Sequence, residues 1–139
     1  MIKIDHLQKV IAQQTVLDIP TFILREGEIA GLVGPVGSGK EVFLNILLGK
    51  VRPTLGTVTI GDLNPYHERD ALSKIMGVMF LEDSLYQRQT VLANLNFYCQ
   101  LYGLPTSRIS EVLQLVGLGD QSTVMADKLL SGLARRLAF

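Results

Sequence analysis

The seven residues GPVGSGK, at positions 34 to 40, have the types and spacing needed to bind a phosphate group. Gly34, Gly37 and Gly39 allow backbone N–H groups to turn inward, where they can donate hydrogen bonds to phosphate oxygens. Lys40 adds a cation for the β and γ phosphates of a nucleotide. An apolar run precedes the segment and an amphipathic pattern follows it, which is the strand–loop–helix context that this motif requires. The segment therefore predicts binding of a nucleotide phosphate.

Glu41 departs from this pattern, because a Ser or Thr hydroxyl normally follows the lysine and ligates Mg²⁺. The Glu41 side chain is longer and places a negative charge beside a negative triphosphate. We favour impaired positioning of Mg²⁺, and the alternative is that Glu41 only stabilises the first turn of a helix. No metal ligand is assigned. The candidate nucleotide-binding set is Gly34, Pro35, Val36, Gly37, Ser38, Gly39, Lys40 and Glu41.

Strands are expected on both sides of the loop. Residues 29–33, IAGLV, are a short apolar run between glycines, which is typical of a strand buried on both faces of a parallel sheet. Residues 1–7 alternate in polarity, residues 56–62 read as a strand that ends in a turn, and residues 74–80 read as a further strand. Together with the helices below, these strands predict an α/β fold in a single domain.

Three helices are predicted from 3.6-residue periodicity. The first begins near Gly39, and the second and third end at glycines in positions 103 and 117. The inward-facing residues are Val42, Phe43, Ile46 and Leu47 in the first helix, Val91, Leu95, Tyr98 and Tyr102 in the second, and Ile109, Val112, Leu113 and Val116 in the third. Cys99 falls within the second pattern and is expected to be a buried thiol.

Composition excludes several classes of function. The chain has 139 residues, of which 47% are apolar, so a packed core is expected. Its 13 basic and 13 acidic residues cancel, and no basic cluster indicates a nucleic acid or a lipid surface as a partner. Neither a signal peptide nor a membrane-spanning run is expected, so the sequence reads as an intracellular, soluble protein.

Four segments in order resemble the nucleotide-binding domain of ABC transporters, nearly from end to end. These are LREGEIAGLVGPVGSGK, LLGKVRPTLGTVTIGDLNP, EDSLYQRQTVLANLNFYCQLYGLP and KLLSGLARRLAF. The first resembles the family's strand and Walker A loop, and the third its helical subdomain in the style of exporters. The last resembles the signature motif. The resemblance implies a partial P-loop NTPase with a phosphate-loop and β part at about 1–80 and a helical subdomain with the signature helix at about 81–139.

The resemblance also implies a mechanism in which two such domains face each other with ATP between them. The Walker A loop of one domain would hold the phosphates. Ser131 and Gly132 would contact the γ-phosphate of the ATP on the opposite subunit. The implied partners are a second nucleotide-binding subunit and a membrane-spanning transporter subunit, and the implied location is the cytoplasmic side of the cell membrane.

Several positions depart from the family pattern. Ile11 stands where an aromatic residue would stack on adenine, and Leu81 stands where a glutamine would sense Mg²⁺. Leu133 replaces the second glycine of the signature, which is also one residue short. The Walker B strand, the catalytic glutamate and the switch histidine would follow Phe139. We therefore expect that residues 1–139 alone do not hydrolyse ATP, and that residues 29–33 lack neighbouring strands.

These departures leave alternatives open. The chain could be a non-catalytic module that docks on a transporter, or a truncated fragment without independent function. A P-loop kinase or GTPase would leave the signature-like segment LSGLARRLA unexplained.

Overall fold

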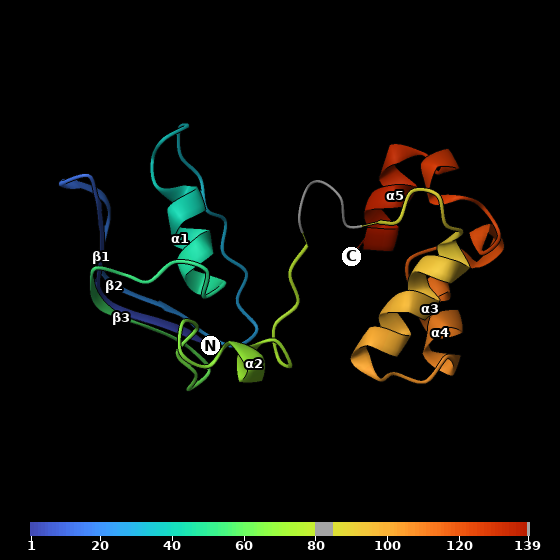
Figure 1. Ribbon diagram of the computed structural model, residues 1–139, viewed down its shortest axis with the longest axis horizontal. Coiled ribbons are helices and arrows are strands. Elements are labelled where there is room, and N and C mark those ends of the chain that lie inside the picture. The colour runs from blue at the N-terminus through green and yellow to red at the C-terminus, as the bar shows by residue number, and fades with distance from the viewer. Residues whose placement is uncertain (80–84, 139) are drawn as a thin grey trace. The chain divides into compact units, whose positions relative to one another are not determined.

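The computed structural model describes residues 1–79 and 85–138. The chain divides into two compact units, Met1–Gly77 and Val78–Phe139, and each has its own hydrophobic core (Figure 1). The first unit combines strands with helices, and the described part of the second is helical. The expected α/β class is thereby confirmed.

The first unit contains a three-stranded antiparallel sheet with one helix packed on it. The strands β1 (Ile2–Ile11), β2 (Gln14–Leu24) and β3 (Leu55–Ile60) lie in the order β2-β1-β3. Two residues with positive φ join β1 to β2, as a tight hairpin requires. Helix α1 (Lys40–Leu47) contributes to the core through its apolar side. The buried core residues are Ile4, Leu7, Ile46 and Val58, flanked by the partly buried Val42, Phe43 and Leu47.

An irregularity at His6 interrupts the β1–β3 ladder, whereas the register of the β1–β2 ladder shifts further along, between Lys9 and Val10. His6 has a φ of 47°, and the register of the β1–β3 ladder shifts between Asp5 and Gln8. In the β1–β2 ladder His6 lies opposite Pro20, which has no N–H to donate. A Cβ on Gly56 of β3 would lie 2.1 Å from the His6 carbonyl oxygen, so only glycine fits there. The extra residue places Leu7, which is fully buried, on the core side of β1.

Two predicted strands are absent from this unit. Residues 29–33 form no strand, and Ile29 and Val33 are almost fully exposed. Residues 74–79 continue from helix α2 (Arg69–Leu72) as a turn and an irregular segment, and residue 80 lies outside the described part. A buried strand needs neighbours for its N–H and C=O groups. Because no described segment pairs with residues 29–33, the apolar pattern there does not produce a strand. The strand predicted at 56–62 is confirmed as β3 and the turn after it.

The described part of the second unit, residues 78–79 and 85–138, contains three α-helices and two short 3₁₀ turns. These are α3 (Val91–Tyr102), α4 (Ser107–Leu115), η1 (Gly119–Gln121), η2 (Ala126–Lys128) and α5 (Ser131–Ala138) (Figure 1). The predicted helix ends are confirmed, because Gly103 and Gly117 adopt left-handed conformations with φ of 64° and 69°. The buried core residues are Val91, Cys99, Ile109, Leu113, Leu118 and Leu137.

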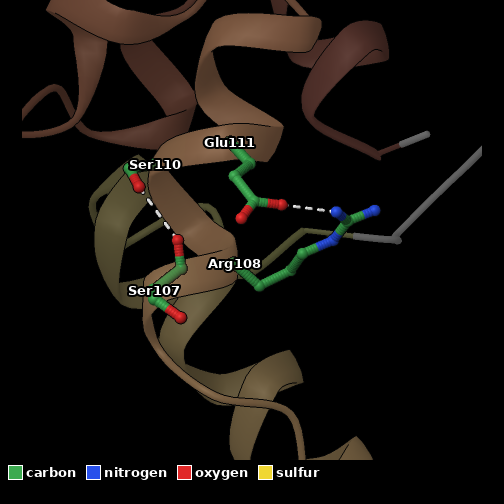
Figure 2. Close-up of polar contacts among 4 residues, drawn as sticks. All are labelled: Ser107, Arg108, Ser110 and Glu111. Carbon is green, nitrogen blue, oxygen red and sulfur yellow. Dashed lines mark hydrogen bonds and ion pairs between the residues drawn. The ribbon is translucent and has the colours of Figure 1, made fainter.

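On the predicted inward faces of α3 and α4, Val91, Ile109 and Leu113 are buried core residues and Leu95 and Val116 pack against that core, whereas Tyr98 and Val112 are only half-buried. Tyr102, the last residue of α3, is 65% exposed and does not belong to the core, so its predicted inward position is wrong. Helix α4 begins with local polar contacts, which Figure 2 shows. The Ser110 hydroxyl donates to the Ser107 carbonyl oxygen at 2.9 Å, and Arg108 pairs with Glu111 one turn later. This ion pair is exposed and contributes only a few tenths of a kcal/mol, about 0.2–0.5.

Candidate nucleotide-binding site

The loop before α1 has a geometry that depends on two glycines. Gly37 and Gly39 have φ angles of 82° and 83° and lie outside any helix or strand, as the sequence predicts. This left-handed region is accessible to glycine without steric cost. Gly39 is also buried, and a Cβ there would lie 2.3 Å from the Val16 carbonyl oxygen of β2. The loop therefore reaches α1 by a close approach to the sheet that a side chain would block.

Lys40 turns back into this loop. Its ammonium group donates hydrogen bonds to the carbonyl oxygens of Gly34 and Pro35, the latter at 2.6 Å, and to the Ser38 hydroxyl at 3.2 Å. A Cβ on Gly34 would lie 2.8 Å from the Ser38 hydroxyl oxygen and 3.7 Å from the Lys40 nitrogen. The loop is therefore closed on its own lysine, and a side chain at residue 34 would displace the Ser38 hydroxyl.

The N-terminus of α1 is suited to an anion. Its N-cap is Gly39, which makes no side-chain capping bond. The first N–H groups of a helix have no intrahelical acceptor, and they carry the positive end of the helix dipole. Lys40 adds a full positive charge beside them. Residues 34–38 are exposed, so a phosphate can approach these donors from solvent.

Glu41 lies in the first turn of α1 and is exposed. In the part of the chain that the structure describes, its carboxylate takes part in no hydrogen bond or ion pair. It is therefore free to change rotamer, and both interpretations of Glu41 remain predictions. Across residues 1–79 and 85–138, no cluster of three or more His, Cys, Asp or Glu side chains could hold a metal by itself.

Ser131 and Gly132 open helix α5 in the second unit, and both are exposed. The Leu130 carbonyl oxygen accepts from the N–H groups of Leu133 and Ala134 at 2.8 and 2.9 Å, which starts the helix. Leu133 packs against the core of the second unit. This packing explains why an apolar side chain is accommodated where the ABC pattern has glycine. The loop at 34–41 and this helix start belong to different units.

The remaining departures lie at residues 11 and 81. Ile11 ends β1 and pairs with Gln14 across the hairpin, with 48% of its surface exposed. An aliphatic side chain there has no aromatic face for a base. Leu81 lies outside the described residues. The close approach of Gly39 to the Val16 carbonyl oxygen was not predicted, and no sequence signal reveals it, since only backbone atoms are involved.

A family model described as ABC transporter matches residues 17–139 of this chain. The chain is 29% identical over 141 residues to the linearmycin resistance ATP-binding protein LnrL of Bacillus subtilis, a match that covers 99% of this chain and 45% of LnrL. It is 35% identical over 124 residues to a fluoroquinolones export ATP-binding protein of Mycobacterium tuberculosis, covering 85% of this chain and 39% of that protein. The chain thus spans less than half the length of these relatives.

Solved structures agree on the fold. The structure of CbiO1 from Clostridium perfringens, titled as part of the ABC transporter complex CbiONQ, matches with a TM-score of 0.86 at 19% identity. This match covers 99% of the chain and 58% of CbiO1. No helix within the described ranges is long and apolar enough to cross a membrane. The chain belongs to the ABC transporter family and corresponds to part of its ATP-binding domain.

Proposed function

We propose that residues 34–41 bind the triphosphate of ATP, and that the chain forms part of the ATP-binding subunit of an export-type ABC transporter. The observation that carries this proposal is the loop geometry. Two left-handed glycines lead the backbone to the N-terminus of α1, and the ammonium group of Lys40 lies against the loop. The names of the relatives from Bacillus subtilis and Mycobacterium tuberculosis, which mention resistance and export, support the choice of exporter.

Binding would exchange one set of contacts for another. The Lys40 ammonium group now donates to oxygens of Gly34, Pro35 and Ser38, and phosphate oxygens offer stronger, charged acceptors. The backbone N–H groups at the start of α1 would donate to the same phosphates. The loop backbone needs no large rearrangement for this exchange, since Gly37 and Gly39 already hold their left-handed conformations.

Mg²⁺ would be held poorly in this site. A bound Mg²⁺ would supply positive charge that neutralises the phosphates. The side chain that would help to hold it here is the Glu41 carboxylate, in place of a short hydroxyl. We infer weak nucleotide binding with little Mg²⁺ dependence. The aliphatic Ile11 weakens binding further, because base–aromatic stacking contributes about 1–3 kcal/mol in other nucleotide complexes.

The arrangement of the whole transporter extends this proposal. Residues 1–80 would form the phosphate-loop part and residues 81–139 the helical part of one domain. Ser131 and Gly132, at the exposed start of α5, would contact the γ-phosphate held by a second nucleotide-binding subunit. A membrane-spanning subunit would complete the assembly at the cytoplasmic face of the membrane.

A second candidate function is a non-catalytic module that docks on a transporter without using ATP. The exposed apolar side chains on α3 and the segment after it favour this candidate. Phe97, Leu101, Tyr102 and Leu104 are each between 41% and 65% exposed. Under this candidate, replacing Phe97 and Leu101 by serine abolishes association with a membrane protein, whereas Lys40→Ala leaves that association intact.

Calorimetric titration with ATP separates the two candidates. Wild-type protein should bind ATP, and Lys40→Ala should weaken binding by about tenfold or more, because a charged hydrogen bond contributes about 1.5–3 kcal/mol. Lys74→Ala is the matched control, since Lys74 is an exposed lysine of the same unit outside the loop. Equal affinities of wild type and Lys40→Ala would contradict the ATP proposal and leave the docking module or a fragment without function.

A further inference from the structure

Asn94 is a buried polar residue within the core of the helical unit. It lies on α3 and is only 1% exposed. Its side-chain oxygen accepts from the Tyr86 N–H at 2.8 Å. Its side-chain nitrogen donates to the carbonyl oxygens of Tyr86 at 3.1 Å, Thr90 at 3.0 Å and Gln89 at 3.4 Å. A carboxamide has one acceptor oxygen and two N–H donors, so the three carbonyl oxygens share two hydrogens and the bond to Gln89 is the longest. Asn94 therefore holds the irregular segment 86–90 against α3.

The same segment pairs with the residues that lead to α5. Main-chain hydrogen bonds run from Val91 N to Val124 O and from Ala126 N to Gln89 O, both at 2.9 Å. A further bond runs from Asp127 N to the carbonyl oxygen of residue 87 at 3.2 Å. The Gln89 carbonyl oxygen thus accepts from Asn94 and from Ala126 at once. Residue 126 begins η2, which is followed within a few residues by α5.

We propose that Asn94 is a positioning residue that couples segment 86–90 to the start of α5 and so fixes Ser131 and Gly132 relative to α3. The significance of those two residues for a bound nucleotide rests on the proposed function, whereas the coupling itself does not. The coupling follows from the shared Gln89 carbonyl oxygen and from the ladder between 87–91 and 124–127. A movement of segment 86–90 shifts the residues before α5 through these bonds.

Site-resolved amide hydrogen exchange on the purified full chain tests this coupling. In Asn94→Ala, protection of the Tyr86 amide should fall about 10- to 100-fold, because its buried acceptor is lost. Protection of Ala126 and Asp127 should fall with it. Leu118, whose N–H donates to Leu113 O at 2.8 Å in the same unit, should keep its protection. Asn96→Ala, which changes a half-buried asparagine on the same helix, is the matched control and should change none of these amides.

A second variant gives a readout that simple loss of packing would not. Asn94→Asp keeps the size of the side chain, but an ionised carboxylate would face the carbonyl oxygens of Tyr86 and Thr90. A protonated carboxyl can donate to one of them. Relative to wild type, the loss of protection at Ala126 should therefore be larger at pH 7 than at pH 4. In Asn94→Ala the ratio to wild type should not depend on pH.

Other ionisable groups near Asn94 also change with pH, and comparing each variant with wild type at the same pH removes their effect. In segment 86–90, α3 and residues 124–128 they are Tyr86, Arg88, Tyr98, Cys99, Tyr102, Asp127 and Lys128. They are present in every variant compared. Asn96→Asp places a charge on the same helix and should show no pH-dependent difference at Ala126.

Three results would overturn the inference. One is loss of protection at Tyr86 alone, which would mean that segment 86–90 moves without the start of α5. Another is equal loss at Tyr86, Ala126 and Leu118, which would mean that Asn94 only stabilises the whole unit. The third is an equal loss of protection at Ala126 in Asn94→Asp at pH 4 and at pH 7. If Asn94→Ala fails to fold, the pH dependence of Asn94→Asp alone tests the inference. None of these outcomes depends on ATP, so they are distinguishable from failure of the proposed function.

Discussion

Residues 29–35 and residues 86–90 are both irregular in backbone, yet their surroundings differ. In the first segment Ile29 and Val33 are 100% and 93% exposed, and residues 29–33 make no backbone hydrogen bond to the described part of the chain, whereas the carbonyl oxygens of Gly34 and Pro35 accept from Lys40. In the second, the backbone is held by the Asn94 side chain and by main-chain bonds to residues 124–127. Segment 86–90 has fewer apolar residues, yet more of its backbone groups make hydrogen bonds. An apolar pattern therefore determines a structure only when the backbone polar groups also find partners.

The largest expected effect contrasts a buried residue of the helical unit with an exposed residue of segment 29–35. Leu118→Ala removes a fully buried side chain and should lower the free energy of unfolding by about 2–5 kcal/mol. Val33→Ala should change it by less than about 0.5 kcal/mol, since this side chain is already in water. Urea titrations of both variants measure the difference. A large cost for Val33→Ala would show that residues 29–35 are packed in solution.

The next effect compares two glycines at helix starts. Gly39→Ala should lower the free energy of unfolding by about 1–3 kcal/mol, because φ is 83° and the new Cβ would meet the Val16 carbonyl oxygen. Gly132→Ala meets no atom within 4 Å and lies in α5, so it should be neutral or stabilise by up to about 1 kcal/mol. Thermal unfolding monitored by circular dichroism checks both. Equal effects in the two variants would mean that the loop is not held as described.

Glu41→Thr tests whether Glu41 impairs the positioning of Mg²⁺ at the first turn of α1. We expect about tenfold tighter ATP binding in the presence of Mg²⁺, or about 1.4 kcal/mol, and a smaller change in its absence. Calorimetric titrations with and without Mg²⁺ measure this. Glu26→Thr, an exposed glutamate outside the loop, is the control. Equal affinities of wild type and Glu41→Thr in Mg²⁺ would show that Glu41 serves only the helix.

A smaller effect contrasts the N-caps of α3 and α4. The Thr90 hydroxyl accepts from the Ala93 N–H at 3.1 Å, whereas Thr106 makes no capping bond. Thr90→Ala should therefore cost about 1 kcal/mol, and Thr106→Ala markedly less. Chemical denaturation of the two variants side by side provides the measurement. The comparison would fail if Thr106→Ala proved as costly as Thr90→Ala.

The smallest effect concerns stability at high pH. Burial raises the pKa of Tyr98 above its ordinary value of 10.0, and the charges of Tyr86 and Tyr102 raise it further. The folded state therefore holds the proton more tightly than the unfolded state. The resulting stability is present below pH 10 and is lost as the pH rises through the folded-state pKa. Above pH 10 wild-type stability should fall more steeply than that of Tyr98→Phe, and urea titrations of both at pH 8 and above pH 10 measure the difference.

Much of the helical part could be predicted from the sequence, because its signals are local. The periodicity of residues 91–102 and 107–115 and the glycines that follow each helix depend on neighbours within one or two turns. The same holds for the loop at 34–40, whose glycines set its backbone directly. The role of Asn94 escaped prediction, although a polar residue between Val91 and Leu95 was a visible signal.

What could not be predicted depends on distant partners. The apolar runs at 29–33 and 74–79 resemble strands, but the neighbours that would pair with them are not specified by those residues. The contact of Gly39 with the Val16 carbonyl oxygen likewise arises from how β2 meets the loop. Periodicity describes which side of an element is apolar, and it does not say whether a partner is present.

The irregularity at His6 also constrains how the sheet can assemble. Pro20 lies on one side of His6, and Gly56 is the residue of β3 that closely approaches the His6 carbonyl oxygen. If β2 slipped by one residue, Pro20 would stand opposite a residue whose carbonyl needs a donor. If β3 slipped, Leu55 or Thr57 would bring a Cβ against the His6 carbonyl oxygen. A shift of either neighbouring strand against β1 therefore costs stability, which favours the observed strand alignment during folding.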